Sequence, residues 1–232
     1  MLRSWINGGS AMRFLIEPLL PPDVCGAMAA ALRQPGEAWR AGEESAGWHA
    51  RAVKRNQQLD PSGALHQRLA EQLRQALLQH PLLQAAAFPR SVHSILFSRC
   101  GPGQGYGRHV DNAWMARGRS DLSFTVALSD PDGYSGGALV LETPGGEEPF
   151  RLPLGHALVY PSTLLHRVDP VDAGERLVAV GWIESRIRHA DQRELLFELD
   201  TARRTLFERH GKDEIFDLVS RSYSNLLRRW DG

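Results

Sequence analysis

The chain of 232 residues is long enough for one large domain, and with 42% hydrophobic and 23% charged residues it has the composition of a globular protein. Its 27 basic side chains balance its 27 acidic ones, so no overall charge attracts it to nucleic acid or to an anionic membrane. No segment approaches the roughly 18 consecutive apolar residues that a transmembrane helix requires. We therefore expect a cytoplasmic protein whose partners are neither nucleic acids nor membranes.

The first residues and the cysteines carry little functional information. Residues 1–11 lack the apolar segment of a secretory signal, and we interpret them as a disordered or vector-derived leader before Met12. Cys25 and Cys100 do not have the spacing of a metal site. Both are expected to be buried thiols in a reducing compartment.

Residues 12–90 are expected to form an α/β part that packs on the core. Leu65, Leu69 and Leu73 recur at helical spacing and predict the clearest helix of this part. In chain order, the predicted elements are a strand over residues 13–20, a helix that follows Pro21-Pro22 and is capped by Asp23, an extended segment over residues 48–59, and a helix that Ser62 opens and that stops near Pro81.

Residues 91–188 have a β pattern. Short segments rich in β-branched, aromatic and aliphatic residues alternate with clusters of Gly, Pro and Asp. The predicted strands cover residues 92–99, 122–128, 138–142, 149–153, 157–160 and 176–183. So many short strands within about 100 residues, without intervening helices, predict a sandwich or jelly roll. The expected fold class is therefore mainly β with flanking helices.

Residues 189–232 return to a helical pattern and are expected to form C-terminal helices. One apolar stripe contains Leu195, Leu196, Leu199, Ala202 and Leu206, and a second contains Ile215, Leu218, Val219 and Leu226. Such helices can dock on the core or on a second copy of the chain. A homodimer through the C-terminal helices is accordingly a reasonable expectation.

Three residues of the β region, His109, Asp111 and His166, form a candidate metal site. His109 and Asp111 are two positions apart, so on an extended backbone their side chains point to the same face. His166 comes from a later part of the β region, as the end of a strand that begins near Tyr160. Two imidazoles and one carboxylate are the protein ligands of a facial-triad Fe(II) site, which leaves three coordination positions open.

The same ligand set also suits hydrolytic zinc, and Arg176 favours iron over zinc. Arg176 opens a strand on the same face as Val178, Val180 and Trp182, and a cation among apolar neighbours needs an anion. A structural salt bridge is one solution, with Asp169, Asp172 or Glu175 as the acid. The functional solution is a clamp for the distal carboxylate of 2-oxoglutarate, whose other end chelates the iron.

The pattern Tyr106-x-x-His109-x-Asp111, followed by His166-x9-Arg176, resembles the Fe(II)/2-oxoglutarate dioxygenases of the prolyl/lysyl hydroxylase type, and among these the bacterial PKHD-type hydroxylases. The similarity extends from about Met12 over nearly the whole chain. It also includes Val53-Lys54-Arg55-Asn56-Gln57-Gln58, Asp121-Leu122-Ser123, Tyr134-Ser135-Gly136-Gly137, Leu158-Val159-Tyr160-Pro161-Ser162 and Trp182-Ile183-Glu184-Ser185-Arg186-Ile187-Arg188.

The resemblance implies a double-stranded β-helix, or jelly roll, with Fe(II), 2-oxoglutarate and O2 as cofactor and cosubstrates, and ascorbate as a further candidate. It implies that His109, Asp111 and His166 hold the iron, that Arg176 binds 2-oxoglutarate, and that Tyr106 donates a hydrogen bond to the cosubstrate. A packed aromatic is the alternative for Tyr106. The implied reaction converts 2-oxoglutarate to succinate and CO2 and hydroxylates a C–H bond.

Other residues have weaker indications. His93 is expected to be a core histidine, and Asn56 and Gln58 either line the cleft or belong to a solvated edge strand. The Asn112-Ala113-Trp114-Met115 segment is a candidate lid, with plain packing as the alternative. Arg186 and Arg188 are expected to be solvated. The sequence departs from the family pattern at His156, where an acidic residue is usual, and at Arg55, where an asparagine is usual; if Arg55 lines the cleft, substrate preference differs.

Three functions are compatible with these residues. The leading hypothesis is a hydroxylase for an amino-acid-like group that is free, peptidyl or part of a metabolite such as a siderophore. A second is demethylation of nucleic-acid bases, but those enzymes carry a further arginine six positions after the first, where this chain has Trp182. The third is a protein that senses iron or 2-oxoglutarate without catalysis.

Overall fold

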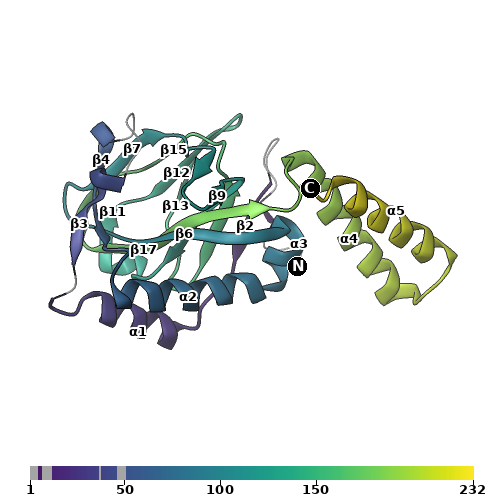
Figure 1. Cartoon of the computed structure of the whole chain (residues 1–232), viewed down its shortest axis with the longest axis horizontal. Helices are drawn as coiled ribbons and strands as arrows, with labels where there is room; N and C mark the ends of the chain where they lie inside the picture. The colour runs from purple at the N-terminus through teal and green to yellow at the C-terminus, as the bar shows by residue number, and fades with distance from the viewer. Residues whose placement is uncertain (1–4, 7–11, 37, 46–50) are drawn as a thin grey trace.

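Two antiparallel sheets stack on one another in the computed structural model, which describes residues 5–6, 12–36, 38–45 and 51–232 (Figure 1). The larger sheet contains, in spatial order, β1 (Trp5–Ile6), β2 (Arg13–Ile16), β14 (Ala157–Pro161), β10 (Leu122–Ala127), β17 (Arg176–Ser185), β6 (Pro89–Cys100), β5 (Gln57–Leu59) and β3 (Trp39–Ala41). The smaller contains β13 (Gly146–Phe150), β12 (Leu139–Thr143), β15 (His166–Val168), β7 (Gly105–His109) and β4 (Lys54–Arg55). The predicted jelly-roll core with flanking helices is confirmed.

Helices cover the outer face of the larger sheet. α1 (Pro22–Leu32) and α2 (Ala64–Gln79) lie against it, and α3 (Pro81–Ala87) follows directly (Figure 1). The main hydrophobic core lies between these helices and the sheet. Leu122, Phe124 and Val126 of β10 belong to this core, whereas Ser123 and Thr125 alternate with them and line the space between the two sheets.

Only part of the space between the two sheets is filled by apolar side chains. A second, smaller cluster lies there, made of Ala127, Leu139, Leu141, Leu152, Leu158 and Tyr160. The remainder of that space is a cavity. The sandwich therefore buries its stabilising core on the helical side and leaves room for a site between the sheets.

Several predicted boundaries in the first part of the chain were wrong. The strand over residues 13–20 ends at Ile16. Asp23 does not cap α1, because Pro22 already occupies the first turn and Asp23 lies inside it. Ser62 does not open α2 either: its hydroxyl bonds Asp60 at 2.8 Å in the turn before Gly63. Pro81 ends one helix but also begins α3, which was missed.

Other segments were only partly predicted. The strand predicted over residues 149–153 lies at Gly146–Phe150 instead, because Pro144-Gly145 is a two-residue hairpin turn and pairing resumes at once, with Thr143 opposite Gly146. The extended segment over residues 48–59 contains β4, β5 and a short 3-10 helix, η3 (Arg51–Val53); residues 48–50 lie outside the described part. Within the leader, Trp5–Ile6 pair antiparallel with β2 rather than being disordered.

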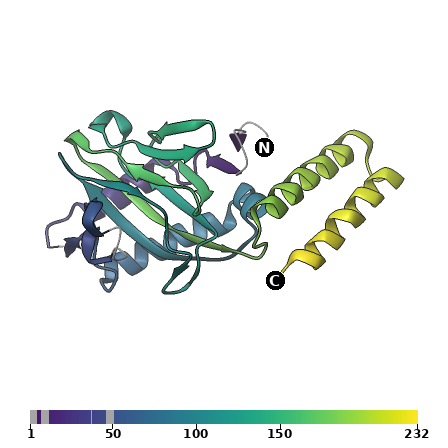
Figure 2. The same ribbon diagram turned by 90° about the horizontal axis from the view of Figure 1, so that it is seen from above.

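The C-terminal helices α4 (Ala190–His210) and α5 (Glu214–Trp230) form a hairpin that projects from the sandwich (Figure 2). The base of α4 is fixed by Arg193, whose guanidinium donates to the carbonyls of Ile187 at 2.8 Å and Arg188 at 2.9 Å. Leu196 is buried there, whereas no residue of α5 is buried within the described chain. The predicted homodimer through these helices stays a prediction.

Two further expectations concern the cysteines and membranes. Cys25 and Cys100 are both buried, free thiols, as predicted. Among the described residues, no helix has the length and apolarity needed to span a bilayer.

Candidate functional site

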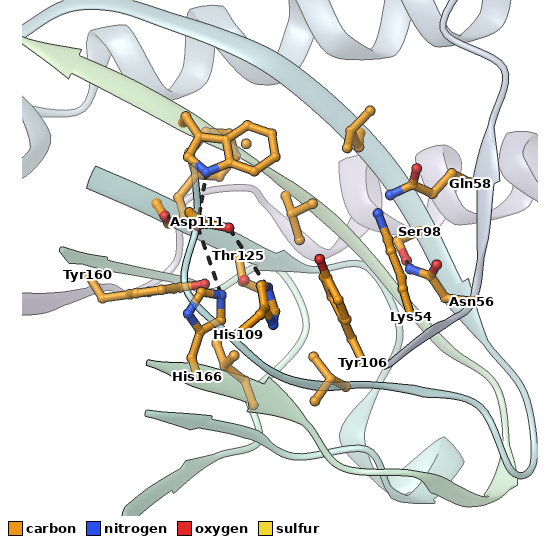
Figure 3. A pocket seen from close by; sticks show the side chains of 18 of the residues that line it. Lys54, Asn56, Gln58, Ser98, Tyr106, His109, Asp111, Thr125, Tyr160 and His166 are labelled. Carbon is orange, nitrogen blue, oxygen red and sulfur yellow. Dashed lines mark hydrogen bonds and ion pairs between the residues drawn. The ribbon is translucent and has the colours of Figure 1, made fainter. Parts of the chain in front are cut away.

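The cavity between the sheets contains every residue of the predicted site (Figure 3). Its polar and charged lining comes from both sheets and from the segment after β7. The lining includes Lys54, Asn56, Gln58, Ser98, Tyr106, His109, Asp111, Asn112, Ser123, Thr125, Tyr160, His166, Arg176 and Trp182. Apolar side chains, among them Leu96, Phe124, Leu139, Val168 and Val180, complete the wall. Such a mixture is typical of a small-molecule site.

Strand pairing brings the three candidate ligands together. His109 is the last residue of β7 and lies directly opposite His166 in the antiparallel pair of β7 with β15. His166 opens β15 rather than ending the preceding strand, because β14 stops at Pro161 and a turn intervenes. Asp111 follows β7 by two residues. One donor atom from each of the three lies within 4.8 Å of the others.

Both histidines are oriented for metal binding through their Nε2 atoms. His109 Nδ1 lies 2.8 Å from the carbonyl of Gly107, and His166 Nδ1 lies 2.9 Å from the carbonyl of Leu164. Since a carbonyl only accepts, each Nδ1 carries the proton and each Nε2 keeps its lone pair. The Nε2 atoms face Asp111, at 3.8 Å from Oδ1 for His109 and 3.9 Å from Oδ2 for His166.

Burial is the main cause and the nearby His166 the second cause of a lowering of the pKa of His109 to about 4. The imidazole is therefore neutral near pH 7, the form that binds a metal. The donor set of two imidazoles and one carboxylate, with the second nitrogen of each imidazole fixed by a carbonyl, fits Fe(II) with open positions for other ligands.

This pKa predicts a pH dependence of stability in the metal-free protein. Between about pH 6.5 and pH 4 the unfolded chain protonates His109 and the folded chain does not, so stability is full above this window and is lost as the pH falls through it. Thermal unfolding from pH 7.5 to 4.5 should show this decrease, and His109→Gln should make the slope shallower. An unchanged slope in that variant would contradict the assignment.

Asp111 is held by two donors that sequence reasoning did not assign. Ser123 Oγ donates to Asp111 Oδ2 at 2.5 Å, and Trp182 Nε1 donates to the same oxygen at 2.9 Å. Ser162 Oγ lies 2.7 Å from Ser123 Oγ and extends the network. Because both donors use Oδ2, the carboxylate has a fixed orientation. The sequence did contain one indication of the Trp182 contact, because strand alternation places Trp182 on the same face of its strand as Arg176.

Loss of these donors should weaken metal binding without removing a ligand. We expect Trp182→Phe and Ser123→Ala each to lower Fe(II) affinity about 10- to 100-fold, because groups that orient a ligand contribute that much. Anaerobic titration with Fe(II) or with Zn(II) measures the effect. Trp114→Phe is the matched control, since Trp114 is 65% exposed. Equal affinities in all four proteins would show that the network is structural only.

Arg176 is buried, at 6% exposure, and lines the same cavity. It opens β17 opposite Cys100. Two of its three expected acidic partners are engaged elsewhere, since Asp169 pairs with Arg167 at 2.7 Å and Glu175 with Arg33 at 2.8 Å. Within the described residues no ion pair includes Arg176, so the salt-bridge alternative is not supported.

Tyr106 and Tyr160 flank the triad. The Tyr106 ring stacks on His109 with centroids 3.6 Å apart, and the Tyr160 ring meets His166 edge-on at 5.3 Å. Burial raises the pKa of both hydroxyls, so both stay protonated and can donate hydrogen bonds. Tyr106 therefore packs on His109, one of the candidate metal ligands, and also lines the cavity, while its hydrogen bond to the cosubstrate stays a prediction.

Of the residues with weaker indications in the sequence, some line the cavity and others lie outside it. Asn56 and Gln58 line the cavity, and β5 is an interior strand rather than a solvated edge. Arg55 is exposed and outside the lining, so its departure from the family pattern does not alter the cleft. His93 is a buried core histidine, with Nε2 at 2.9 Å from the carbonyl of Arg119.

Asn112 and Met115 line the mouth of the cavity, next to the exposed Trp114. Trp114–Met115 and Gly118–Arg119 form a small hairpin, β8 and β9. Arg119 ties its far end to the sandwich through Asp121 and Glu184. The lid function of this segment stays a prediction. Arg186 is paired with Asp231, and Arg188 is exposed; His156 is half-buried in a turn.

The cavity, the triad and the buried arginine on a jelly roll define the chain as an Fe(II)- and 2-oxoglutarate-dependent dioxygenase. The sequence profile of the 2OG-Fe(II) oxygenase superfamily matches residues 95–184, and that of the PKHD-type hydroxylase C-terminal domain matches residues 191–231. The superfamily uses Fe(II), 2-oxoglutarate and O2. The chain belongs to the PKHD-type hydroxylase family.

Similar proteins support this membership. A PKHD-type hydroxylase of Synechococcus elongatus is 57% identical over 193 residues, covering 82% of this chain and 86% of its own length. One from Prochlorococcus marinus strain MIT 9313 is 44% identical over 218 residues, covering 94% and 99%. The fold is similar to a Pseudomonas putida prolyl-4-hydroxylase, with a TM-score of 0.54 and 23% identity over 76% of this chain and 94% of that one. A prolyl hydroxylase from Trichoplax adhaerens also has a TM-score of 0.54, at 15% identity over 79% and 86%.

Proposed function

We propose that this protein hydroxylates a C–H bond of an amino-acid-like group, with 2-oxoglutarate converted to succinate and CO2. The observation that carries the proposal is Arg176, a buried cation without an acidic partner in the described residues, in the same cavity as the triad. An uncompensated buried guanidinium is costly unless a ligand supplies the anion. A dicarboxylate that also chelates a metal fits both requirements.

His109, Asp111 and His166 would hold Fe(II), which when bound supplies the oxidative chemistry of the reaction. Arg176 binds the distal carboxylate of 2-oxoglutarate with its planar fork and so sets the direction in which the cosubstrate enters. Tyr106 donates a hydrogen bond from its protonated hydroxyl to 2-oxoglutarate. The apolar wall, which includes Phe124 and Val180, keeps bulk water from the reacting groups.

The test is succinate formation by the Fe(II)-loaded protein in the presence of 2-oxoglutarate, O2 and candidate substrates. Free amino acids, peptides and carboxylated metabolites such as siderophores form the panel. We expect one class to stimulate succinate release with an equivalent gain of one oxygen atom, detected by mass spectrometry. Binding of 2-oxoglutarate without stimulation by any class would favour the sensing alternative. Ascorbate dependence is measured in the same assay.

A further inference from the structure

The C-terminal hairpin of α4 and α5 carries apolar side chains that the described part of the chain leaves exposed. The hairpin projects from the sandwich, and α5 contains no buried residue within that part (Figure 2). Leu195 of α4 is 52% exposed, and Ile215 and Leu218 of α5 are 62% and 61% exposed. If such side chains form one contiguous surface, they mark an interaction site.

Two side-chain contacts fix which sides of the two helices face each other. The rings of Phe207 on α4 and Phe216 on α5 have centroids 5.2 Å apart. Arg203 Cζ on α4 lies 4.3 Å from the centroid of the Tyr223 ring on α5. These side chains therefore lie in the seam between the helices. A second apolar set lies outside the seam and contains Leu195, Leu199, Ala202 and Leu206 on α4, and Ile215, Leu218, Val219 and Leu226 on α5.

Both halves of this second set lie on the same side of the hairpin. With about 100° of rotation per residue, each half is centred roughly 90° from the seam, in the same rotational sense along both helices. Because α4 and α5 run antiparallel, equal rotations in the same sense bring the two halves to one side; in parallel helices they would lie on opposite sides. The set therefore forms one apolar surface across both helices, which we call the hairpin face.

The hairpin face of α4 matches its own copy in the reverse direction. Antiparallel packing of α4 on α4 of a second chain can place Leu195 opposite Leu206 of that chain. The same register places Leu199 opposite Ala202. A surface that pairs with itself in this way is what a two-fold symmetric dimer requires.

The hairpin face of α5 has the same property about nearly the same point. A two-fold axis at Ser222 places Leu218 opposite Leu226 of the second chain. The contact of Phe207 with Phe216 puts the middle of the α4 half level with Tyr223, the residue after Ser222. One axis thus serves both helices to within about half a turn, and two hairpins can form an antiparallel four-helix bundle.

The charges at the helix ends support this arrangement. The first turn of each helix is acidic and the last turn is basic. The acidic residues are Asp191, Glu214 and Asp217, and the basic residues are Arg209, His210, Arg228 and Arg229. Asp217 already pairs with Lys212 at 2.8 Å, so Glu214 is the acid of α5 that can meet Arg229 of the second chain. Antiparallel packing brings each acidic turn to a basic turn of the copy and keeps the two sandwiches at opposite ends (Figure 2).

The hairpin face is large enough for a stable contact. A helix with the 17 residues of α5 is about 25 Å long, and two helices side by side are about 20 Å wide. The face therefore covers about 500 Å² on each chain, and the pair buries about 1,000 Å², the lower limit of specific interfaces.

We propose that the hairpin face binds a second copy of this chain and forms a two-fold dimer through an antiparallel four-helix bundle. The surface is remote from the cavity, so this inference goes beyond the proposed function and does not depend on it. An anionic membrane surface fits less well, because the helices that bind such surfaces have a basic polar face, whereas both charges occur along this hairpin.

Sedimentation analysis of the full chain tests the dimer. We expect a species of twice the chain mass of 25.8 kDa that dissociates on dilution. Leu218→Glu should weaken the association about 100-fold or more, because the dimer loses two leucines and each buried leucine contributes about tenfold. Trp114→Glu is the matched control, since Trp114 is exposed to a similar degree, 65% against 61%, but lies on the sandwich. Circular dichroism should show unchanged helix content in both variants.

Two results would overturn the dimer. One is a chain that stays monomeric at about 100 µM, below the affinity of specific interfaces, whether or not it binds anionic vesicles instead. The other is a Leu218→Glu variant that associates as tightly as the Trp114→Glu variant, which would place the contact elsewhere.

Chemical linking tests the antiparallel arrangement. Ser222 is exposed and lies near the proposed axis, whereas the native Cys25 and Cys100 are buried. A short bis-maleimide should therefore link two chains through Ser222→Cys. Ser224→Cys is the control, because two residues further along the helix the side chain points roughly 160° away. Absence of linked dimer with Ser222→Cys, or equal linking with Ser224→Cys, contradicts the proposal.

Discussion

Asp111→Ala is expected to abolish substrate-coupled succinate formation and to lower the affinity for Fe(II) by more than about 100-fold. Removal of a group that only orients a ligand costs about 10- to 100-fold, so loss of the ligand itself costs more. The variant removes the carboxylate of the candidate site and leaves the two imidazoles. It also leaves the Ser123 and Trp182 donors without their acceptor.

Anaerobic metal titration followed by metal analysis measures this effect. Asp111→Asn serves as a second variant, since it keeps an acceptor for Ser123 and Trp182 but removes the charge. Asp132→Ala is the control, because Asp132 is exposed and outside the cavity. If Asp111→Asn binds Fe(II) as tightly as the unaltered protein, Asp111 is not the carboxylate ligand.

Arg176→Met is expected to weaken 2-oxoglutarate binding by about 30-fold or more, since truncating one partner of a buried charge pair costs about 2–5 kcal/mol. Metal affinity should be retained, because Arg176 is not among the three candidate ligands. Equilibrium binding of 2-oxoglutarate to the Zn(II)-loaded protein measures the change. Arg188→Met, at an exposed position, is the control.

Stability distinguishes the clamp from a structural role for the same residue. Removing a buried arginine from a salt bridge destabilises the protein by about 3–5 kcal/mol, because the acidic partner is left as an uncompensated buried charge. Arg176 has no such partner in the described residues, so Arg176→Met should leave the unfolding free energy of the ligand-free protein unchanged or raise it. If Arg176→Met strongly destabilises the protein and leaves 2-oxoglutarate binding unchanged, Arg176 has a structural role and does not bind the cosubstrate.

Local sequence patterns predicted which segments form strands and helices better than they predicted where those elements begin and end. The strand that became β17 was recognised because alternation and β-branched residues are properties of the segment itself. The helix caps at Asp23 and Ser62 were wrong, because proline at the start of α1 and the turn at Asp60 compete with the cap for the same backbone positions. The start of β13 depends on its pairing with β12, which no single segment encodes.

The sequence by itself determined the fold class and the chemistry of the site. The spacing of His109 and Asp111, the later His166 and Arg176, and the β pattern around them predicted the metal, the cosubstrate and the scaffold. These inferences succeed because residue type and short spacing are enough to indicate ligand chemistry.

Only the tertiary structure decided how the site is oriented and what else shares its cavity. Ser123 and Trp182 meet on one oxygen of Asp111, and Lys54 enters the cavity from a strand of the opposite sheet. Each of these contacts joins segments distant in the chain. They depend on strand register and sheet stacking, which arise from the packing of the whole domain rather than from any local sequence preference.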